Sequence, residues 1–320
     1  MLVSNLLRTV VRLFLIVKVK EYIIVHNNIS IIFVVYKSGQ ILFKNIKNLK
    51  NYEIIIIDND KDSNIKNEIL RINKSIKYFK MNKNLGIAKA ANFAFRKINN
   101  EFVLYLSADT IITHDNILRL KNIFDKYINI GIVAPMHQNT KGEYLGNYFC
   151  HPINRIIKRT LPQKKIYSSL SKIRPSGDFS VKCVWGAPIL IKSSLINKIG
   201  FFDNNYFMYF EDTDLCDRVI TSGHEIIETS DSYCTHYKAI SSSNSLRYAF
   251  RTMTAFKFSE LYYFSKYERK YVIRIYIHLF DYLFRFVINI FLLNKKKVYT
   301  NLFRIIGILK FLFYQKKTKF

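Results

Sequence analysis

The sequence is poor in cysteine, proline and glycine, and it lacks the spacings that define several common protein classes. Its cysteines are far apart and form no CxxC pair: Cys150, Cys183, Cys216 and Cys234. A reducing compartment is therefore expected, whereas a structural zinc site or a disulfide framework is not. Only Gly39 follows the first apolar run, so the glycine-rich phosphate loop of a sugar nucleotidyltransferase is missing.

Acidic residues are also scarce. The 320 residues include 23 Asp and Glu against 50 Lys and Arg, which gives a net charge of +27. Such an excess attracts polyanions such as nucleic acid, diphosphates or an anionic membrane surface, although a lysine-rich solvated surface explains much of it equally well. Zinc-finger spacings and aromatic RNA-binding motifs do not occur, and no nucleic-acid partner is expected.

The N-terminal region lacks a long uninterrupted apolar run. Arg8 and Arg12 interrupt the opening "LLRTVVRLFLIVKV", and no small-residue cleavage site follows it. We therefore expect neither a signal peptide nor a spanning helix here. Residues 1–28 are predicted to form an amphipathic or apolar extension, and the protein is expected to be cytoplasmic.

Short β-branched runs alternate with helix-length segments from residue 29 onwards, at 29–36, 52–58, 75–80, 101–109 and 130–135. This alternation is typical of an α/β fold with an open, mostly parallel sheet and helices on both faces. Such sheets bind ligands beyond the carboxyl ends of their strands, where Asp58 and Asp109 stand. One such Asp is more often a helix cap or a turn residue. Two of them, with an acid cluster further on, favour a nucleotide or metal site.

Two segments connect this part to the acid cluster. Residues 136–182 are polar and basic, and they are predicted to form a long loop or flap. The segment "VWGAPILIKSSLINKIGFFD", residues 184–203, predicts a strand, a Ser-capped helix and a turn.

Acid is concentrated in "FMYFEDTDLCDRV", residues 207–219. A helix that begins near Glu211 has one apolar arc, formed by Leu215, Cys216, Val219 and Ile220. Its polar side would hold Glu211, Asp214, Asp217 and Arg218, with a surface ion pair between Asp214 and Arg218. Asp212 alone projects into the apolar arc. It either caps the first turn or faces a cleft as a general base, and the spacing leaves both roles open.

The segment from about Lys238 changes character, with 17 basic against 3 acidic residues and aromatic residues throughout. One polar stripe runs along an otherwise apolar helix there, at Arg274, His278, Asp281 and Arg285. This pattern predicts a C-terminal helical region, 241–320, that associates with a membrane surface and turns its basic side towards the headgroups. A helical layer packed on the main domain is the alternative.

Five segments resemble, in the same order, the family 2 glycosyltransferases and most closely their bacterial rhamnosyltransferase-like branch. They are "DND" after the second strand, "NKNLGIAKAANFAF", "LSADT", the stretch from "GAPIL" to "FEDTDLCDRV", and "THY". The resemblance covers residues 29–240, and its acidic segment is the most specific part. It implies a Rossmann-like GT-A fold, a dTDP- or UDP-sugar donor, a divalent metal (Mn or Mg) and inversion at the anomeric carbon.

The resemblance also implies roles for individual residues. Those at the donor nucleotide would be Val35, Tyr36, Asp58, Asn84 and Gly86. The metal would be bound by Asp109 and His236. The catalytic base would be Asp212, with Glu211 as its neighbour and alternative. The sugar and acceptor would lie near Trp185 and Gly186.

The sequence departs from the family pattern at "SAD", where Ser107 and Ala108 occupy the first two positions of the usual "NPD" or DxD motif. The predicted function is an inverting transferase that moves a sugar to a membrane-proximal or lipid-linked surface glycan. Rhamnose is the sugar suggested by the branch, and the inner face of the cell membrane is the expected location. The alternative is a catalytically inactive GT-A protein that binds glycan or a protein partner.

Overall fold

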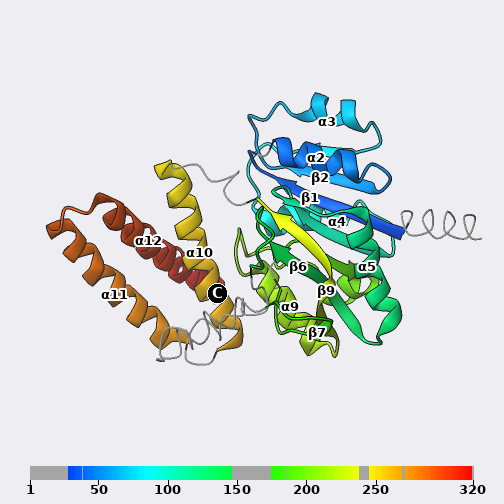
Figure 1. Ribbon diagram of the computed structural model, residues 1–320. Coiled ribbons are helices and arrows are strands. Elements are labelled where there is room, and N and C mark those ends of the chain that lie inside the picture. Colours follow the sequence, from blue (N-terminus) through cyan, green and yellow to red (C-terminus); the bar gives the residue numbers. More distant parts are fainter. Residues whose placement is uncertain are drawn as a thin grey trace, which may run out of the picture.

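The computed structural model describes residues 28–37, 39–145, 174–184, 186–237, 245–268 and 271–318. These residues form a nine-stranded sheet with helices on both faces, and a bundle of three long helices lies beside it (Figure 1). Of the predicted N-terminal extension, all but its last residue lies outside the described residues. Most of the predicted flap does as well.

The sheet has the strand order β3-β2-β1-β4-β8-β6-β9-β5, and β7 pairs with β9. The prediction of parallel strands is confirmed for its first half, which consists of β1 (Ile29–Val35), β2 (Glu53–Asp58), β3 (Lys77–Lys80) and β4 (Phe102–Ser107). The second half is mixed. It contains β5 (Thr110–Ile111), β6 (Ile130–Gln138), β7 (Asp178–Ser180), β8 (Ile189–Lys192) and β9 (Glu225–His236). β8 runs antiparallel to both β4 and β6, whereas β6 and β9 are parallel.

Helices bury an apolar side against each face of this sheet, as predicted. One face is covered by α2 (Gln40–Asn48), α3 (Lys66–Ile72) and α5 (His114–Lys126). The other is covered by α4 (Ile87–Phe95), α8 (Ser193–Ile199) and α9 (Glu211–Thr221). The strands carry continuous runs of buried Ile, Leu and Val because both of their faces are covered. Each such side chain contributes about 1.5–3 kcal/mol on burial.

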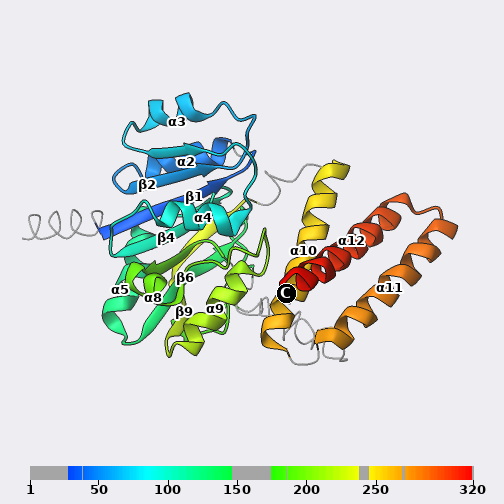
Figure 2. The same cartoon turned by 180° about the vertical axis from the view of Figure 1, so that it is seen from behind.

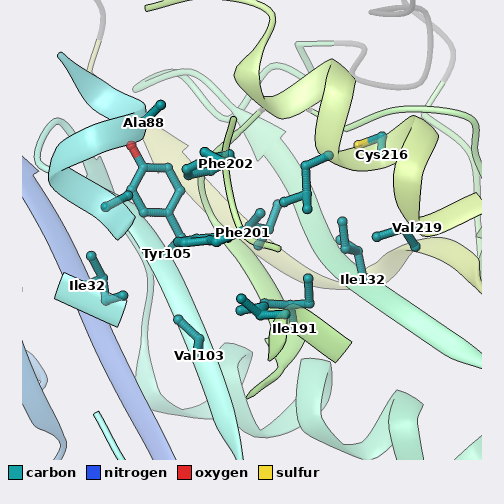
Figure 3. Close-up of a cluster of buried hydrophobic side chains, with 14 of the residues drawn as sticks. Ile32, Ala88, Val103, Tyr105, Ile132, Ile191, Phe201, Phe202, Cys216 and Val219 are labelled. Carbon is teal, nitrogen blue, oxygen red and sulfur yellow. The ribbon is translucent and has the colours of Figure 1, made fainter. Parts of the chain in front are cut away.

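Figure 3 shows the core beneath α4 and α9. Tyr105 of β4 lies edge-on to Phe202, with ring centroids 5.3 Å apart, and Phe202 stacks on Phe201 at 4.1 Å. Packing against these rings therefore holds the Tyr105 ring in place.

The serine cap predicted for α8 is wrong. The residue before the helix is Lys192, which makes no side-chain capping hydrogen bond, and Ser193 is the first helical residue. The Ser193 hydroxyl instead donates to the Asn100 carbonyl at 2.6 Å, which ties α8 to the turn before β4.

The C-terminal bundle consists of α10 (Leu246–Tyr267), α11 (Tyr271–Phe291) and α12 (Lys295–Thr318). In Figures 1 and 2, α10 lies next to the sheet and α11 lies farthest from it. Gly307 allows α12 to approach α10 closely, since a Cβ there would be 2.7 Å from the Thr254 carbonyl oxygen. Tyr263 and Phe264 of α10 join the core beneath α9. Within the part of the chain described, none of the helices combines the length and apolar character needed to cross a bilayer.

The predicted orientation of the α11 polar stripe is wrong for Arg274 and His278. Arg274 forms an ion pair with Glu268 at the end of α10, at 2.9 Å. His278 Nδ1 lies 3.3 Å from Lys257 Nζ, inside the bundle. The outward face of α11 is apolar instead and includes Phe280, which is 74% exposed.

Candidate active site

A cleft opens beyond the carboxyl ends of β1 and β4, where the predicted ligand site lies. The sheet contributes Val34, Tyr36, Asn59, Tyr105, Ser107, Ala108 and Asp109 to its wall. Other segments contribute Asn84, Gly86, Ile87, Phe207 and Met208, and α10 contributes Tyr248, Arg251 and Thr252. The cleft therefore lies between the sheet domain and the C-terminal bundle.

Three predicted nucleotide residues lie at the ends of β1 and β2. Tyr36 lines the cleft. The Val35 side chain does not reach it, because it is buried against α2 on the other face of the sheet. Asp58 is fully buried beneath the cleft and accepts hydrogen bonds from the Asp60 N–H at 2.9 Å and the Tyr78 hydroxyl at 2.5 Å. The next residue, Asn59, lines the cleft instead.

Asn84 and Gly86 form the turn that leads into α4. The Gly86 N–H donates to Asn84 Oδ1 at 2.8 Å, and Gly86 has a φ of +80°. A Cβ at Gly86 would be 2.2 Å from the Phe207 carbonyl oxygen, which accepts the Ile87 N–H at 2.7 Å. Only glycine fits both this backbone conformation and this contact. Gly86 thus brings the acid segment against the start of α4.

The two predicted metal ligands are brought together by the pairing of β5 with β9, in which Thr110 lies opposite His236. His236 Nε2 lies 3.4 Å from Asp109 Oδ2, and the Ser107 hydroxyl donates to Asp109 Oδ1. Burial alone would raise the pKa of Asp109, but the hydrogen bonds from His236 and Ser107 outweigh it and lower the pKa below its usual value. Ser107 therefore supports the remaining acid of the "SAD" segment.

This donor set fits a divalent cation that also binds a substrate. Carboxylate oxygen and imidazole nitrogen both bind first-row metals, and neighbouring ligands of a six-coordinate ion lie about 3 Å apart. Among the described residues, no group of three or more His, Cys, Asp or Glu converges as a metal site. Phosphate oxygens and water would therefore have to complete the coordination, as is common for cations bound with nucleotides. His137, whose ring centroid is 6.5 Å from that of His236, stays neutral because burial lowers its pKa to about 3.

The predicted base and its neighbour lie at the start of α9, which begins at Glu211 as predicted. Asp212 is half-buried, and its carboxylate accepts the Gly186 N–H at 3.0 Å and the Thr213 N–H at 2.8 Å. Glu211 is buried, and its Oε2 has no hydrogen-bond partner among the described residues. Burial and the Asp212 charge raise the pKa of Glu211 well above its usual value. Trp185, predicted beside Gly186, lies outside the described residues.

The turn before α9 sets the position of the Glu211 and Asp212 carboxyl groups. Tyr209 and Phe210 both adopt left-handed backbone conformations, with φ of +69° and +68°. Such conformations cost non-glycine residues about 1–3 kcal/mol each and persist only where packing enforces them. Both rings contact Phe256 of α10, at centroid distances of 5.4 and 5.6 Å. Helix α10 thus holds the turn in place.

Asp214 and Ile220 do not lie where the helical pattern predicts. Asp214 forms the expected ion pair with Arg218, at 2.8 Å, but it is fully buried rather than on the surface. It also pairs with Lys266 and accepts the Tyr267 hydroxyl at 3.0 Å. Both partners belong to α10, so Asp214 anchors α9 to the bundle. Ile220, expected in the buried arc, is 42% exposed.

Tyr105 links the two acid groups. Burial raises its pKa well above the usual value, and the charges of Glu211, Asp212 and Asp109 raise it further. Carboxylates from both motifs therefore lie near one side chain of the cleft wall, although Glu211 and Asp212 are not among the residues that line the cleft. The β1 register adds Asp58 to this edge, because Val35 pairs with Asp58 and Val34 pairs with Ser107.

Arg251 was not predicted as a site residue. It is the only Lys or Arg among the described residues that line the cleft, and its guanidinium lies 4.9 Å from the centre of the Tyr36 ring. It faces the cleft only because α10 packs across the sheet edge, and no motif in the sequence marks it.

Comparison with known proteins identifies the family. Residues 30–172 match the model of glycosyl transferase family 2. This chain contains a family 2 glycosyltransferase domain. The glycosyltransferase is 25% identical over 205 residues to the rhamnosyltransferase WbbL of Escherichia coli (strain K12), an alignment that covers 59% of this chain and 74% of that protein. It is 26% identical over 206 residues to the low-salt glycan biosynthesis hexosyltransferase Agl10 of Haloferax volcanii. This alignment covers 60% of this chain and 61% of that protein. The predicted resemblance is confirmed.

Solved structures show the fold of this glycosyltransferase to be an α/β GT-A fold, as predicted. The mannosyltransferase PcManGT from Pyrobaculum calidifontis, in complex with GDP-Man and Mn2+, matches with a TM-score of 0.53 at 12% identity, over 89% of this chain and 87% of that one. GalNAc-T7 with UDP, GalNAc and Mn2+ matches with a TM-score of 0.52 at 16% identity, over 68% of this chain and 44% of that one.

Proposed function

We propose that the protein is an inverting glycosyltransferase that moves a sugar from a nucleotide-diphosphosugar to a hydroxyl of a surface glycan. The observation that carries this proposal is the grouping of two acid motifs at Tyr105. Asp109 lies in the cleft wall with Tyr105, and the Glu211–Asp212 pair at the start of α9 lies near enough to Tyr105 for its charge to raise the pKa of that side chain. One group suits a diphosphate-bound cation, and the other suits a proton acceptor. The name of the Escherichia coli relative favours rhamnose as the sugar.

The donor would lie along the carboxyl ends of the strands. Tyr36, Asn84 and Gly86 would contact the nucleoside, and Asp58 would support that pocket from beneath through Asp60. Arg251 would lie over the diphosphate, since it is the cation of the described cleft wall. A guanidinium binds phosphate oxygens with charge-assisted hydrogen bonds.

Asp109 and His236 would hold Mn2+ or Mg2+, which supplies positive charge to the departing diphosphate. Across the sugar, Asp212 would take the proton of the acceptor hydroxyl as that oxygen attacks the anomeric carbon. The bond between that carbon and the diphosphate oxygen breaks in the same in-line step, so the configuration inverts. Asp212 suits this role better than Glu211, because its carboxylate accepts two backbone N–H groups, whereas burial and the Asp212 charge raise the pKa of Glu211 and favour its protonated form. Gly186 would hold Asp212 through its N–H, and Trp185 beside it would contact the sugar or acceptor.

We propose that the acceptor is membrane-proximal and that the bundle binds the inner, anionic face of the cell membrane. The outer face of α11 exposes Tyr276, Phe280 and Phe291, and Lys295–Lys297 follow at its end. Apolar burial and attraction to anionic lipid favour the same orientation.

In vesicle flotation, the protein should bind phosphatidylglycerol more strongly than phosphatidylcholine. Phe280→Glu should weaken binding, whereas the control Ile128→Glu, exposed at the end of α5, should not. Equal loss in both variants would remove this surface from the proposal.

Metal-dependent donor binding tests the transferase proposal. A ligand that binds only the folded protein raises its melting temperature. In a panel of nucleotide-sugars, we expect at least one donor to raise the melting temperature more with Mn2+ than without it. Asp109→Asn should remove the Mn2+-dependent part. If no nucleotide-sugar stabilises the protein under either condition, the proposal is wrong.

The presence of Ser107 where the DxD form of the family motif has an acid favours one other function, a GT-A protein that binds a glycan or partner without catalysis. Such a protein would show no transfer of radiolabelled sugar from any stabilising donor to extracted membrane glycolipid. Transfer in that assay excludes this alternative.

A further inference from the structure

A second concavity lies beside the cleft, between the segment before Met208 and the helices α10 and α12. Its volume of about 470 Å³ is within the range of small-molecule sites. Its walls are largely apolar and include Phe207, Phe250 and Phe258. We call it the bundle groove. It shares Phe207 and Arg251 with the cleft, so the two are neighbours on either side of these residues.

Three cations line this apolar groove, namely Arg247, Arg251 and Lys310. Within the described ranges, none of them forms an ion pair, whereas nearby Lys257 and Lys266 of α10 do. Lys310 Nζ instead lies 5.4 Å from the centre of the Phe250 ring. Three like charges along one groove repel one another, and an anion between them would remove that cost.

Apolar walls with a cluster of unneutralised cations are complementary to one kind of ligand, an anion attached to a hydrocarbon chain. The phosphate would lie among the cations, and the chain would contact the phenylalanine rings. A ligand held in this way could extend its polar end past Phe207 into the cleft, whose sheet side includes Tyr105 and Asp109. The groove also belongs to the bundle whose α11 carries the exposed apolar face.

We propose that the bundle groove binds the acceptor, a sugar joined through phosphate or diphosphate to a long apolar chain. Arg247 and Lys310 would bind the phosphate, and Arg251 would lie between this phosphate and that of the donor. The proposal rests on the transferase function proposed above, because it gives the groove its place beside the donor.

Binding of geranylgeranyl diphosphate to the full chain tests this site. The cleft is first saturated with UDP or dTDP, and geranylgeraniol and inorganic pyrophosphate serve as partial ligands. We expect the diphosphate probe to bind at least ten-fold more tightly than either. Arg247→Gln/Lys310→Gln should weaken probe binding at least ten-fold without changing nucleoside diphosphate binding. The control Lys44→Gln/Lys47→Gln, which removes two exposed charges of α2, should change neither.

A steric variant separates the two halves of the site. Ala255→Trp would fill the groove and leave its cations in place. It should therefore weaken binding of the probe but not binding of pyrophosphate. Unchanged probe affinity in the double variant, or a probe no better than pyrophosphate, would overturn the proposal. The proposal would also be overturned if the double variant lost affinity for phosphatidylglycerol vesicles to the same extent as for the probe. The groove cations would then bind the phosphates of the bilayer. Failure of the protein to bind any nucleoside diphosphate would count against the transferase function itself.

Discussion

The Gly186 N–H donates to Asp212 Oδ2 at 3.0 Å, and the two residues are in close contact. A Cβ added at Gly186 would be 3.1 Å from the Asp212 Cβ and 3.3 Å from Oδ2. Such contacts leave no room for a methyl group unless the carboxylate moves. Gly186 therefore fixes the position of the proposed base, and that positioning can be tested.

Gly186→Ala should lower kcat about ten-fold and leave the KM for the donor nearly unchanged, because small displacements of a reacting group reduce rate more than binding. Steady-state kinetics with the stabilising donor checks this. The melting temperature is the control, since a large decrease would mean that the loss came from misfolding.

Asp214→Asn should destabilise the protein by about 3–5 kcal/mol, because it leaves Arg218 and Lys266 without their buried partner. Denaturant unfolding measures this change. The matched control is Asp125→Asn, which breaks the exposed pair with Lys121 and should cost no more than about 1 kcal/mol. Similar losses in both variants would mean that Asp214 does not anchor α9 to the bundle.

Glu228 gives the protein a pH-dependent stability. Burial raises the pKa of Glu228 from 4.5 to about 8, although a hydrogen bond from Tyr144 opposes the shift. The folded state therefore holds a proton that the unfolded state releases between these values. The contribution of Glu228 to the free energy of unfolding is fully present below about pH 4.5. It declines by about 1.4 kcal/mol per pH unit as the pH rises to about 8. Glu228→Gln should stabilise the protein relative to wild type, and this gain should be far larger at pH 8 than at pH 5. Thermal unfolding of both proteins at the two pH values measures it. Equal effects at the two pH values would contradict the shift.

Arg251→Gln should weaken UDP or dTDP binding ten-fold or more and leave binding of the free nucleoside unchanged, because only the diphosphate carries charge for the guanidinium to bind. Titration calorimetry with both ligands checks this. Arg251→Lys keeps the charge and should retain part of the affinity. A loss that is the same for nucleoside and diphosphate would mean that Arg251 acts on the shape of the pocket through Tyr36.

The parallel half of the fold could be predicted because its strands are continuous β-branched runs between helix-length segments, and buried parallel strands require that pattern. The ends of β2 and β4 then located Asp58 and Asp109. The antiparallel insertion of β8 could not be predicted, since "ILIK" is equally compatible with either direction.

The errors at α9 and α11 have a common physical cause. Asp214 is four residues from Arg218 and suits a solvated face, but Lys266 and Tyr267 cover it from α10. Arg274 suits a headgroup, but Glu268 at the end of α10 pairs with it. Helical periodicity defines the faces of one helix and carries no information about which distant segment covers them. Arg251 could not be predicted for the same reason.

The most direct measurement is the single-turnover rate of sugar transfer by Asp212→Asn beside its affinity for the donor nucleotide. The rate should fall by roughly 10²–10⁴-fold, the contribution of a positioned general base. Affinity for UDP or dTDP should stay within about two-fold of wild type, and Asp125→Asn should change neither. Transfer at a near wild-type rate would contradict the account, because Asp212 would then not be the base.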